Sequence, residues 1–385
     1  MSKDIKFNFL NSDEEERYQK HLTLKEIGYE GQLDLKNSSV LCIGAGGLGS
    51  SVLLYLAAAG IGKIGIVDND HVEKSNLQRQ IIHETNTIGK LKIDSALERI
   101  KKFNPNIELF TFPKRIDPNN ALEIIQEFDI ICDCSDNFGT KYLINDACLI
   151  LDKPIVFGSV QGFEGQVSVF NLHKTSPNLR DLLPDWPLKN AVPSCVEYGV
   201  VGVSTGLIGI LQVNEIIKII LKKGEILDGT ILIFDLLNMK MKKLNLKSDQ
   251  NNKQISNLSQ FAEFYSEDGC SEKNSEHNNE IKKIKAEEFN ILYKARPTKI
   301  LLIDVRESEE FSISAIEGSI SIPLSNLNLK TGLEFIQKES LSKEVFTICK
   351  SGKRSEKASR ILAEFKIDSR SIEGGIEKVK TILCN

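Results

Sequence analysis

The stretch Val40-Leu-Cys-Ile-Gly-Ala-Gly-Gly-Leu-Gly49 decides the fold of the first part of the chain. Its first four residues are continuously apolar, as in a buried strand, and residues 47–60 are typical of a buried helix. The Gly-x-Gly-x-x-Gly pattern between them lets the backbone approach phosphate groups at the helix N-terminus. Asp68 ends the next apolar run, where a carboxylate can hold ribose hydroxyls. The sequence therefore predicts a nucleotide site with these candidate residues: Gly44, Gly46, Gly47, Gly49 and Asp68.

Strand and helix patterns alternate from about residue 38 to residue 245. The expected buried strands are residues 40–43, 63–68, 128–134 and 154–157, and the expected helices include residues 47–60, 92–103 and 206–222. Continuous apolar strands that alternate with helices indicate a parallel sheet covered on both faces. Residues 165–170 and 229–235 have a more antiparallel character, so we predict a mixed sheet in a Rossmann-like α/β domain over residues 1–247.

Composition changes after Leu246. Residues 248–280 are rich in Ser, Asn, Glu and Gln, and they are predicted to form a linker with at most one short helix. A second alternating block covers residues 281–385, with strands expected at 299–304 and 345–349 and a helix at 353–365. A block of this length can bury its own core, so we predict a smaller α/β domain there.

The 385 residues carry a net charge of −4, which gives no indication of a general nucleic-acid binder. The N-terminal residues lack the apolar core of a signal peptide. The longest apolar run that we considered as a membrane span, residues 52–61, is too short for one. We therefore expect a soluble cytoplasmic protein without nucleic-acid or membrane partners.

NAD-dependent enzymes carry the same glycine pattern, and a tight turn without a ligand is the simplest alternative. Four further polar residues argue for adenylation by ATP: Asn76, Arg79, Lys92 and Asp136. Hydride transfer does not need cations such as Arg79 and Lys92. Adenylation needs them, because negative charge grows on the α-phosphate and the departing pyrophosphate as a carboxylate attacks. Asp136 follows a strand end and can hold Mg²⁺ between phosphates.

Several motifs follow one another in unbroken order across residues 12–245. They are Arg17-Tyr18, the glycine loop, Asp68-Asn-Asp70, Ser75-Asn-Leu-Gln-Arg-Gln80, Gly89-Lys-Leu-Lys92, Asp133-Cys-Ser-Asp-Asn137 and Ser194-Cys-Val-Glu-Tyr-Gly199. Together they resemble the MoeB/ThiF/HesA family, relatives of the ubiquitin-activating enzymes. The resemblance implies that ATP and Mg²⁺ are used to adenylate the C-terminal glycine of a ubiquitin-like (β-grasp) sulfur carrier of the MoaD/ThiS type.

The same resemblance implies a role for each candidate residue. Asp68 is expected to hold the ribose, and Asp136 to serve the Mg²⁺. The phosphates are expected to contact Asn76, Arg79 and Lys92. Arg17 resembles an arginine that reaches into the ATP site of the neighbouring subunit, so a homodimer is expected.

One departure from the family concerns a structural zinc, which members usually bind through two Cys-x-x-Cys pairs. Asn178 and Asp181 stand where the first pair would fall, and no cysteine occurs near the second position, residues 247–253. Such exposed oxygen ligands would hold zinc poorly. We therefore predict no zinc site.

The eight cysteines are scattered, without any Cys-x-x-Cys, so neither a disulfide scaffold nor a four-cysteine zinc site is expected. Three of them lie in apolar runs and are predicted core residues: Cys42, Cys132 and Cys134. Cys195 lies between a polar loop and an apolar helix, a position that favours reactivity, although Glu197 would oppose thiolate formation. Its position matches the family's reactive cysteine; a buried, inert thiol is the alternative.

Cys349 ends a predicted strand and opens the loop Lys350-Ser-Gly-Lys-Arg-Ser355. Such a loop can surround sulfur with backbone N–H groups, and its cations would stabilise a thiolate or persulfide. Its spacing differs from that of phosphatases, because Ser355 stands at the sixth position after the cysteine. With Leu302-Ile-Asp-Val-Arg306 and Ile316-Glu-Gly-Ser-Ile-Ser-Ile-Pro323, this block resembles a rhodanese, which implies that Cys349 carries sulfur as a persulfide, whereas Asp304 and Arg306 are structural.

The order of the two domains resembles fused adenylyltransferase/sulfurtransferases of the MoeZ type. We therefore expect carrier adenylation followed by persulfide transfer from Cys349, with molybdopterin synthesis as the first choice of pathway and a cysteine desulfurase as the type of sulfur donor. Carriers for thiamine, cysteine or tRNA thiolation are alternatives with the same chemistry. A tRNA-modifying enzyme and a non-catalytic nucleotide-binding scaffold are alternatives of other classes.

Overall fold

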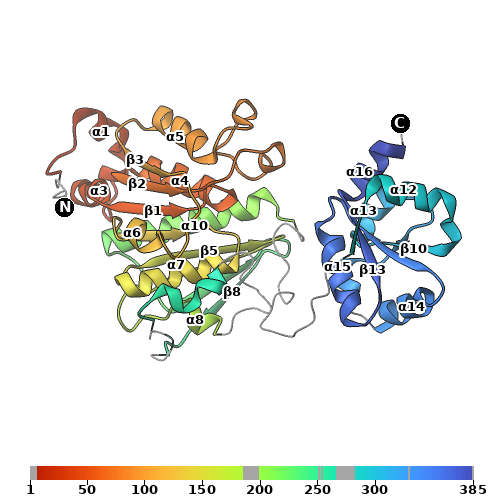
Figure 1. Ribbon diagram of the computed structural model, residues 1–385. Coiled ribbons are helices and arrows are strands. Elements are labelled where there is room, and N and C mark those ends of the chain that lie inside the picture. The colour runs from red at the N-terminus through yellow and green to blue at the C-terminus, as the bar shows by residue number, and fades with distance from the viewer. Residues whose placement is uncertain are drawn as a thin grey trace. The chain divides into compact units, whose positions relative to one another are not determined.

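The computed structural model describes residues 7–184, 199–249, 252, 255–265, 282–327 and 330–383. The chain forms two compact units, Met1–Glu272 and Lys273–Asn385 (Figure 1). Each unit has a sheet and apolar cores of its own.

The first unit is built on an eight-stranded sheet in the order β3-β2-β1-β4-β5-β6-β7-β8. Its strands are β1 (Ser39–Ile43), β2 (Lys63–Val67), β3 (Glu108–Phe112), β4 (Ile130–Asp133), β5 (Ile155–Gln161), β6 (Glu164–Phe170), β7 (Thr230–Asp235) and β8 (Lys240–Asn245). The strands from β3 to β5 in this order pair in parallel, and those from β5 to β8 pair antiparallel. The predicted Rossmann-like domain with a mixed sheet is confirmed.

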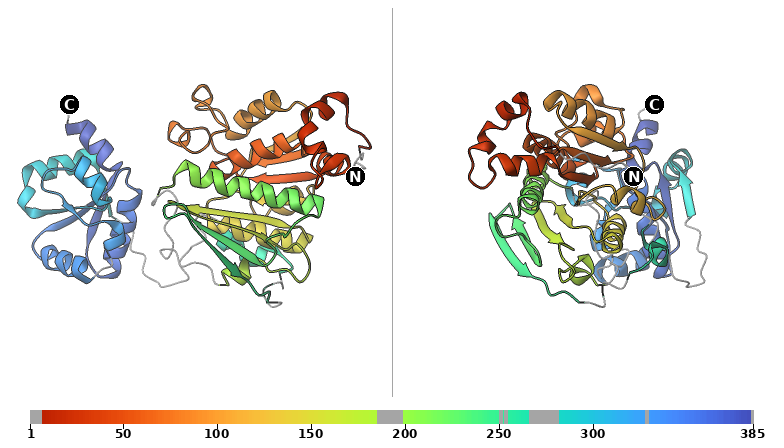
Figure 2. Two further views of the ribbon diagram at one scale, coloured as in Figure 1. Left: turned by 180° about the vertical axis from the view of Figure 1, so that it is seen from behind. Right: turned by 90° about the vertical axis from the view of Figure 1, so that its left-hand side faces the viewer.

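Helices cover both faces of this sheet. Figure 1 shows α7 in front of the sheet, and the view from behind in Figure 2 shows α10 across the other face. One face carries α4 (Gly47–Ala59), α5 (Lys92–Phe103) and α10 (Gly202–Leu221), and the other carries α6 (Ala121–Ile125) and α7 (Phe138–Leu151). Along β1, Val40 and Cys42 join the first core, whereas Leu41 and Ile43 join the second. The strand is apolar throughout because both of its faces are buried.

The N-terminal segment adds α1 (Ser12–Arg17), α2 (Gln19–Leu22) and α3 (Gly28–Lys36), and α8 (Leu179–Leu182) follows β6. α10 corrects two predictions, because it begins at Gly202 rather than at residue 206 and is the one described helix long and apolar enough to span a membrane. Its Ile208, Val213 and Ile216 lie in the core shared with α4. The composition of α10 therefore reflects a core position.

Part of the segment expected to be a linker packs on the first unit. Residues 258–265 form a 3₁₀ turn, η4 (Leu258–Phe261), and a short helix, α11 (Ala262–Tyr265). Leu258 and Tyr265 are buried in the core that α7 shares. The Tyr265 hydroxyl donates a hydrogen bond of 2.6 Å to Asp146 Oδ2. These contacts fasten residues 258–265 to the first unit.

The second unit has a five-stranded sheet of parallel strands in the order β11-β10-β12-β13-β9. The strands are β9 (Lys282–Lys285), β10 (Ile300–Asp304), β11 (Ile320–Ser321), β12 (Glu344–Ile348) and β13 (Ser369–Glu373). The helices are α12 (Ala286–Ala295), α13 (Ser308–Ile313), α14 (Lys330–Ser340), α15 (Lys353–Glu364) and α16 (Gly375–Leu383). Alternate residues of β10 face two separate cores, one with α14 and α15 and one with α12 and α16. The predicted smaller α/β domain is confirmed.

Candidate functional site

The glycine loop joins β1 to α4 and packs against the residues that follow β4. Gly44 has a φ of +104°, and a Cβ there would lie 2.8 Å from the Cys134 carbonyl oxygen. A Cβ at Gly49 would lie 2.0 Å from the Gly44 carbonyl oxygen. Both positions therefore require glycine. The loop leads to the N-terminus of α4, where free N–H groups favour a phosphate.

Asp68 lies at the end of β2, directly beside this loop. Its Oδ2 accepts a hydrogen bond of 2.8 Å from the Ala45 N–H, and its Oδ1 accepts one of 2.8 Å from the Asp70 N–H. Burial raises the pKa of this carboxyl, and nearby Lys92 opposes the shift. The structure thus places Asp68 on the loop, as a ribose-binding carboxylate requires.

Lys92 begins α5 and is buried, with 7% of its surface exposed. Its Nζ donates to Asp70 Oδ2 at 2.7 Å, and its backbone N–H donates to the Asp70 carbonyl at 2.8 Å. Asp70 therefore holds the ammonium group near Asp68. A cation fixed in this way is available to a phosphate without losing side-chain freedom on binding.

Residues 75–80 lie between the glycine loop and the start of α10. Asn76 is buried, and its Oδ1 accepts a hydrogen bond of 3.0 Å from the Glu73 N–H. Arg79 Nη1 donates to the Ser75 carbonyl at 3.1 Å. The approach to α10 is close, since a Cβ at Gly202 would lie 2.4 Å from the Gln78 carbonyl oxygen. The segment is therefore held on two sides.

Two residues near the loop were given no role in the sequence analysis, although Gln80 ends one of its motifs. His83 is buried, with Nε2 3.0 Å from the Ala45 carbonyl and Nδ1 2.9 Å from Ser95 Oγ. Burial lowers the pKa of His83, so a neutral ring holds the loop carbonyl. Gln80 is also buried, and its Nε2 lies 3.7 Å from where a Cβ on Gly46 would stand. Both residues continue the run that contains Arg79, which was the available signal.

Asp136 is exposed and follows β4 closely, two residues beyond Cys134. Since the Cys134 carbonyl packs on Gly44, the chain leaves β4 beside the glycine loop. Within the described ranges, no group of three His, Cys, Asp or Glu side chains converges to hold a metal ion. A Mg²⁺ at Asp136 would therefore take most of its ligands from phosphates and water.

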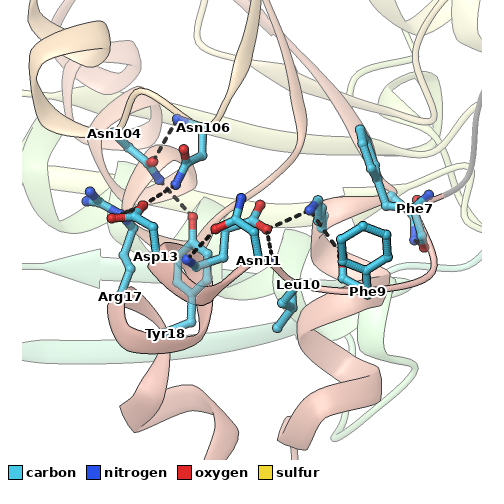
Figure 3. A network of polar contacts seen from close by, with 12 residues as sticks. Phe7, Phe9, Leu10, Asn11, Asp13, Arg17, Tyr18, Asn104 and Asn106 are labelled. Atoms are coloured by element: carbon cyan, nitrogen blue, oxygen red, sulfur yellow. Dashed lines mark hydrogen bonds and ion pairs between the residues drawn. The ribbon is translucent and has the colours of Figure 1, made fainter.

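Arg17 lies away from these residues, at the other end of α5. Its Nη1 donates to the Phe103 carbonyl at 3.2 Å, and its Nε lies 3.7 Å from Asp13 Oδ2. Figure 3 shows this network, in which Asn104 Nδ2 donates to the Tyr18 hydroxyl oxygen at 2.8 Å. The structure does not bring Arg17 to the nucleotide loop of its own chain.

Where family members usually carry zinc-binding cysteines, this chain has a network of hydrogen bonds around Asp181, which we call the tie. Asp181 Oδ2 accepts from the Asn178 N–H at 2.9 Å and from Asn178 Nδ2 at 3.0 Å. Asp181 Oδ1 accepts from the Asp249 N–H at 2.8 Å and from Asn252 Nδ2 at 2.9 Å. Asn178 is fully buried, which corrects the exposure expected from the sequence. Both carboxylate oxygens of Asp181 are engaged in hydrogen bonds, so these residues do not fit a zinc site. The tie joins the two segments that paired cysteines would otherwise join.

The remaining cysteine predictions divide into two groups. Cys42, Cys132 and Cys134 are buried free thiols in the core, as expected. Cys195 and Glu197 lie outside the described residues.

In the second unit, Cys349 follows β12 and is buried beneath its loop. The Gly352 N–H donates to Cys349 Sγ at 3.2 Å, and Gly352 has a φ of +101°. Ser355 Oγ lies 3.7 Å from Sγ and makes hydrogen bonds of 2.8 Å with the Gly352 carbonyl and with Ser371 Oγ. Such a loop can hold a thiolate or a persulfide.

The other two conspicuous residues of this unit are structural. Arg306 Nε and Nη2 bond to Asp304 Oδ1 and Oδ2 at 2.9 and 2.7 Å, and Nη2 also donates to the Ser314 carbonyl at 2.6 Å. Both side chains are buried. They tie the end of β10 to the segment after α13.

A Rossmann-like unit with charged side chains at its glycine loop, followed by a unit with a loop-held cysteine, defines an enzyme that combines nucleotide and sulfur chemistry. A model of the ThiF family matches residues 18–256, and a rhodanese-like domain model matches residues 286–381. The chain belongs to the ThiF family and carries a C-terminal rhodanese-like domain. It is an enzyme of the adenylyltransferase and sulfurtransferase class.

Curated relatives resemble the chain over most of its length. It is 38% identical over 371 residues to "Adenylyltransferase and sulfurtransferase MOCS3" of Culex quinquefasciatus, which covers 92% of this chain and 83% of that protein. It is 38% identical over 373 residues to "Probable adenylyltransferase/sulfurtransferase MoeZ" of Mycobacterium tuberculosis, which covers 95% and 93%. A "Probable molybdopterin-synthase adenylyltransferase" of Gracilaria tenuistipitata var. liui is 36% identical over 371 residues, with 95% and 98% covered.

Solved structures are similar to the first unit at lower identity. The crystal structure of PaaA has a TM-score of 0.55 and 21% identity, and the match covers 65% of this chain and 78% of that one. Escherichia coli MccB with MccA-N7isoASN gives a TM-score of 0.55 and 21% identity, with 60% and 72% covered. These likenesses show the fold alone.

Proposed function

We propose that the first unit adenylates the C-terminal glycine of a ubiquitin-like sulfur carrier and that the second unit supplies the sulfur for a thiocarboxylate. The observation that carries this proposal is the pairing of two sites in one chain. Asp68 and Lys92 lie at the glycine loop of one unit, and Cys349 lies beneath the Gly352 N–H in the other. The name of the Gracilaria relative favours molybdopterin synthesis as the pathway.

The adenylation step joins the carrier to AMP. A carboxylate oxygen of the terminal glycine attacks the α-phosphorus of ATP, the bond to the β-phosphate oxygen breaks, and pyrophosphate leaves. Arg79 and Lys92 neutralise the charge that grows on the phosphates, and Asn76 adds a polar contact. Mg²⁺, with Asp136 as its protein ligand, would screen the phosphate charge.

The sulfur step releases the AMP. A persulfide anion on Cys349 attacks the acyl carbon, the bond to the AMP oxygen breaks, and a carrier acyl disulfide with Cys349 remains. Attack by the Cys195 thiolate on the Cys349 sulfur then frees the carrier thiocarboxylate and leaves a Cys195–Cys349 disulfide. A dithiol reductant restores both thiols, and a persulfide donor of the cysteine desulfurase type reloads Cys349.

The assembly that we propose is a cytoplasmic homodimer in which Arg17 serves the ATP site of the partner subunit. The domains are proposed as residues 1–247 and 281–385, with a linker between them that includes the packed residues 258–265. A tethered Cys349 has a higher effective concentration at the adenylate than a separate sulfurtransferase would have.

Intact-protein mass spectrometry tests this function. Candidate carriers of the molybdopterin, thiamine, cysteine and tRNA-thiolation pathways are each incubated with the enzyme, ATP, Mg²⁺ and a persulfide source. We expect the molybdopterin carrier to gain the mass difference between sulfur and oxygen. Conversion of a different carrier would reassign the pathway, and the absence of both a mass change and carrier-dependent pyrophosphate would refute the adenylation proposal.

A further inference from the structure

The side-chain amide of Gln80 is buried, and its oxygen has no hydrogen-bond partner among the described residues. Only 4% of the surface of this residue is exposed. Its backbone is well anchored, since the Gln80 N–H donates to the Asn76 carbonyl at 3.0 Å. A buried amide oxygen without a partner lowers stability, and an apolar side chain of similar shape would avoid that cost. The position of the amide therefore needs an explanation.

The nitrogen end of this amide faces the glycine loop. Gln80 Nε2 lies 3.7 Å from the point where a Cβ on Gly46 would stand. Gly46 is the N-cap residue of α4, so the amide nitrogen approaches the loop where N–H groups at the start of the helix favour a phosphate. Because Gly46 has no side chain, nothing of its own fills the space between the loop backbone and the amide.

The surroundings hold Gln80 in this orientation. Three residues farther along the chain, His83 bonds to the carbonyl of Ala45 in the same loop at 3.0 Å. Two residues before it, the Gln78 carbonyl packs against Gly202 at the start of α10. The backbone is therefore fixed on both sides of Gln80, against the glycine loop and against α10, and burial of the side chain limits the freedom of the amide to turn away.

We infer that Gln80 is a further binding residue of the adenylation site, whose Nε2 donates a hydrogen bond to a phosphoryl oxygen of ATP and of the acyl-adenylate. This inference rests on the proposed function of the first unit. A neutral, directional donor complements the cations Arg79 and Lys92, because it can fix the orientation of the phosphoryl group. The unpaired Oε1 lowers the stability of the fold, and the residue is retained because its amide nitrogen contributes to ATP binding.

Two substitutions of similar shape test the inference in the full-length enzyme. Gln80→Met removes the donor without adding charge, and Gln80→Glu replaces the donor with an acceptor that repels phosphate. We expect kcat/KM for ATP in carrier-dependent pyrophosphate exchange to fall roughly 10- to 100-fold in Gln80→Met, and further in Gln80→Glu. The Tm of Gln80→Met without nucleotide should equal or exceed that of the wild type.

Gln78→Met is the matched control, because Gln78 is exposed and donates only a long bond of 3.4 Å to the Val200 carbonyl. It should stay within about twofold of the wild type, as expected for an exposed side chain that makes no contact with the glycine loop. If Gln80→Met folds and keeps the wild-type kcat/KM for ATP, the inference is wrong while the adenylation proposal stands. A fall in Tm below that of the wild type would also overturn it, because the amide would then be a packing element.

Failure of the proposed function is distinguishable from failure of this inference. If the wild type shows no carrier-dependent exchange with any carrier, the dissociation constant for ATP is measured directly by calorimetry. A larger dissociation constant for ATP in Gln80→Met than in the wild type would still support the phosphoryl contact. Equal constants would overturn it.

Discussion

Glu310 holds Arg354 in an ion pair with two hydrogen bonds, Nη1 to Oε2 at 2.6 Å and Nη2 to Oε1 at 2.9 Å. The pair joins α13 to the first turn of α15, directly after the Cys349 loop. The sequence analysis expects the guanidinium to add positive charge at the sulfur, and the structure places Arg354 close enough to interact electrostatically with Cys349, while Glu310 offsets part of its charge. The cations left exposed at the loop are Lys350 and Lys353.

This ion pair predicts an acid-sensitive contact in the rhodanese-like unit. The hydrogen bonds from Arg354 lower the pKa of Glu310 below its ordinary value of 4.5. A carboxyl whose pKa is lowered by folding stabilises the folded state at pH values above its pKa in the unfolded chain. This stability is lost as the pH falls through its pKa in the folded protein. Below pH 4.5 we therefore expect lower protection of the amides at the start of α15, measured by hydrogen exchange and mass spectrometry on the full chain after correction for the intrinsic exchange rate at each pH.

The matched variant for this experiment is Glu310→Gln, which cannot titrate. The protection of its amides at the start of α15 should already be lower at neutral pH and should change less on acidification than that of the wild type. Identical pH profiles of the two proteins would show that the ion pair does not stabilise the helix start.

Substitutions in the two units should separate the two half-reactions. Cys349→Ala removes the sulfur-carrying atom but leaves the nucleotide site intact, so pyrophosphate exchange should stay within about twofold while thiocarboxylate formation falls by more than about 10³-fold. Arg79→Ala removes a cation at the phosphates and should lower both activities by roughly 10²- to 10³-fold. Thiocarboxylate formation by Cys349→Ala, in purified components without free sulfide, would contradict the relay.

The parts of the fold that were predictable are those whose signal is local. β1, β2, β4 and β5 are apolar runs because both faces of their sheet are buried, and the glycine loop is one short motif. By contrast, every residue of β8 is exposed, so this strand carries no apolar pattern at all. Its place follows from backbone pairing with β7, which no residue of β8 reveals by itself.

The contacts of several residues could not be predicted for a similar reason, because their partners lie far away in the sequence. Arg354 meets a carboxylate 44 positions earlier in the chain, and His83 meets a loop carbonyl 38 positions earlier. Tyr265 lies in a polar stretch whose composition indicates a linker, yet its hydroxyl bonds to Asp146, 119 positions earlier. A sequence gives the chemistry of each such residue but not the contact that defines its role.

The position of Arg17 predicts that this residue acts on the partner subunit. It bonds to the carbonyl of Phe103, the last residue of α5, whereas Lys92 is the first residue of the same helix. Eleven helical steps separate the two ends by about 16 Å, too far for Arg17 to serve the phosphates beside Lys92 in its own chain. Arg17→Ala and Lys92→Ala should each be inactive alone, yet mixed subunits should recover activity.

Subunit exchange measures this complementation. In a random mixture half of the dimers are mixed, and one of their two sites holds both native residues, so pyrophosphate exchange should return to about a quarter of the wild-type rate. Native mass spectrometry of the mixture, with one variant carrying a mass tag, is the control that mixed dimers form. If the two inactive variants exchange subunits without any gain in activity, Arg17 has a structural role through Phe103 instead.

The tie between Asp181 and residues 249 and 252 predicts a first unit that is stable without zinc. Asp181 accepts four hydrogen bonds across two segments, and Asp181→Ala removes all four, including both bonds from the buried Asn178. The substitution should lower the free energy of unfolding by about 1.5–3 kcal/mol. Asp181→Asn keeps one acceptor oxygen, so its free energy of unfolding should lie between those of the wild type and Asp181→Ala. Because the tie needs no metal, a strong chelator should leave the Tm of the wild type unchanged, and a fall in Tm on chelation would show that zinc stabilises this unit after all.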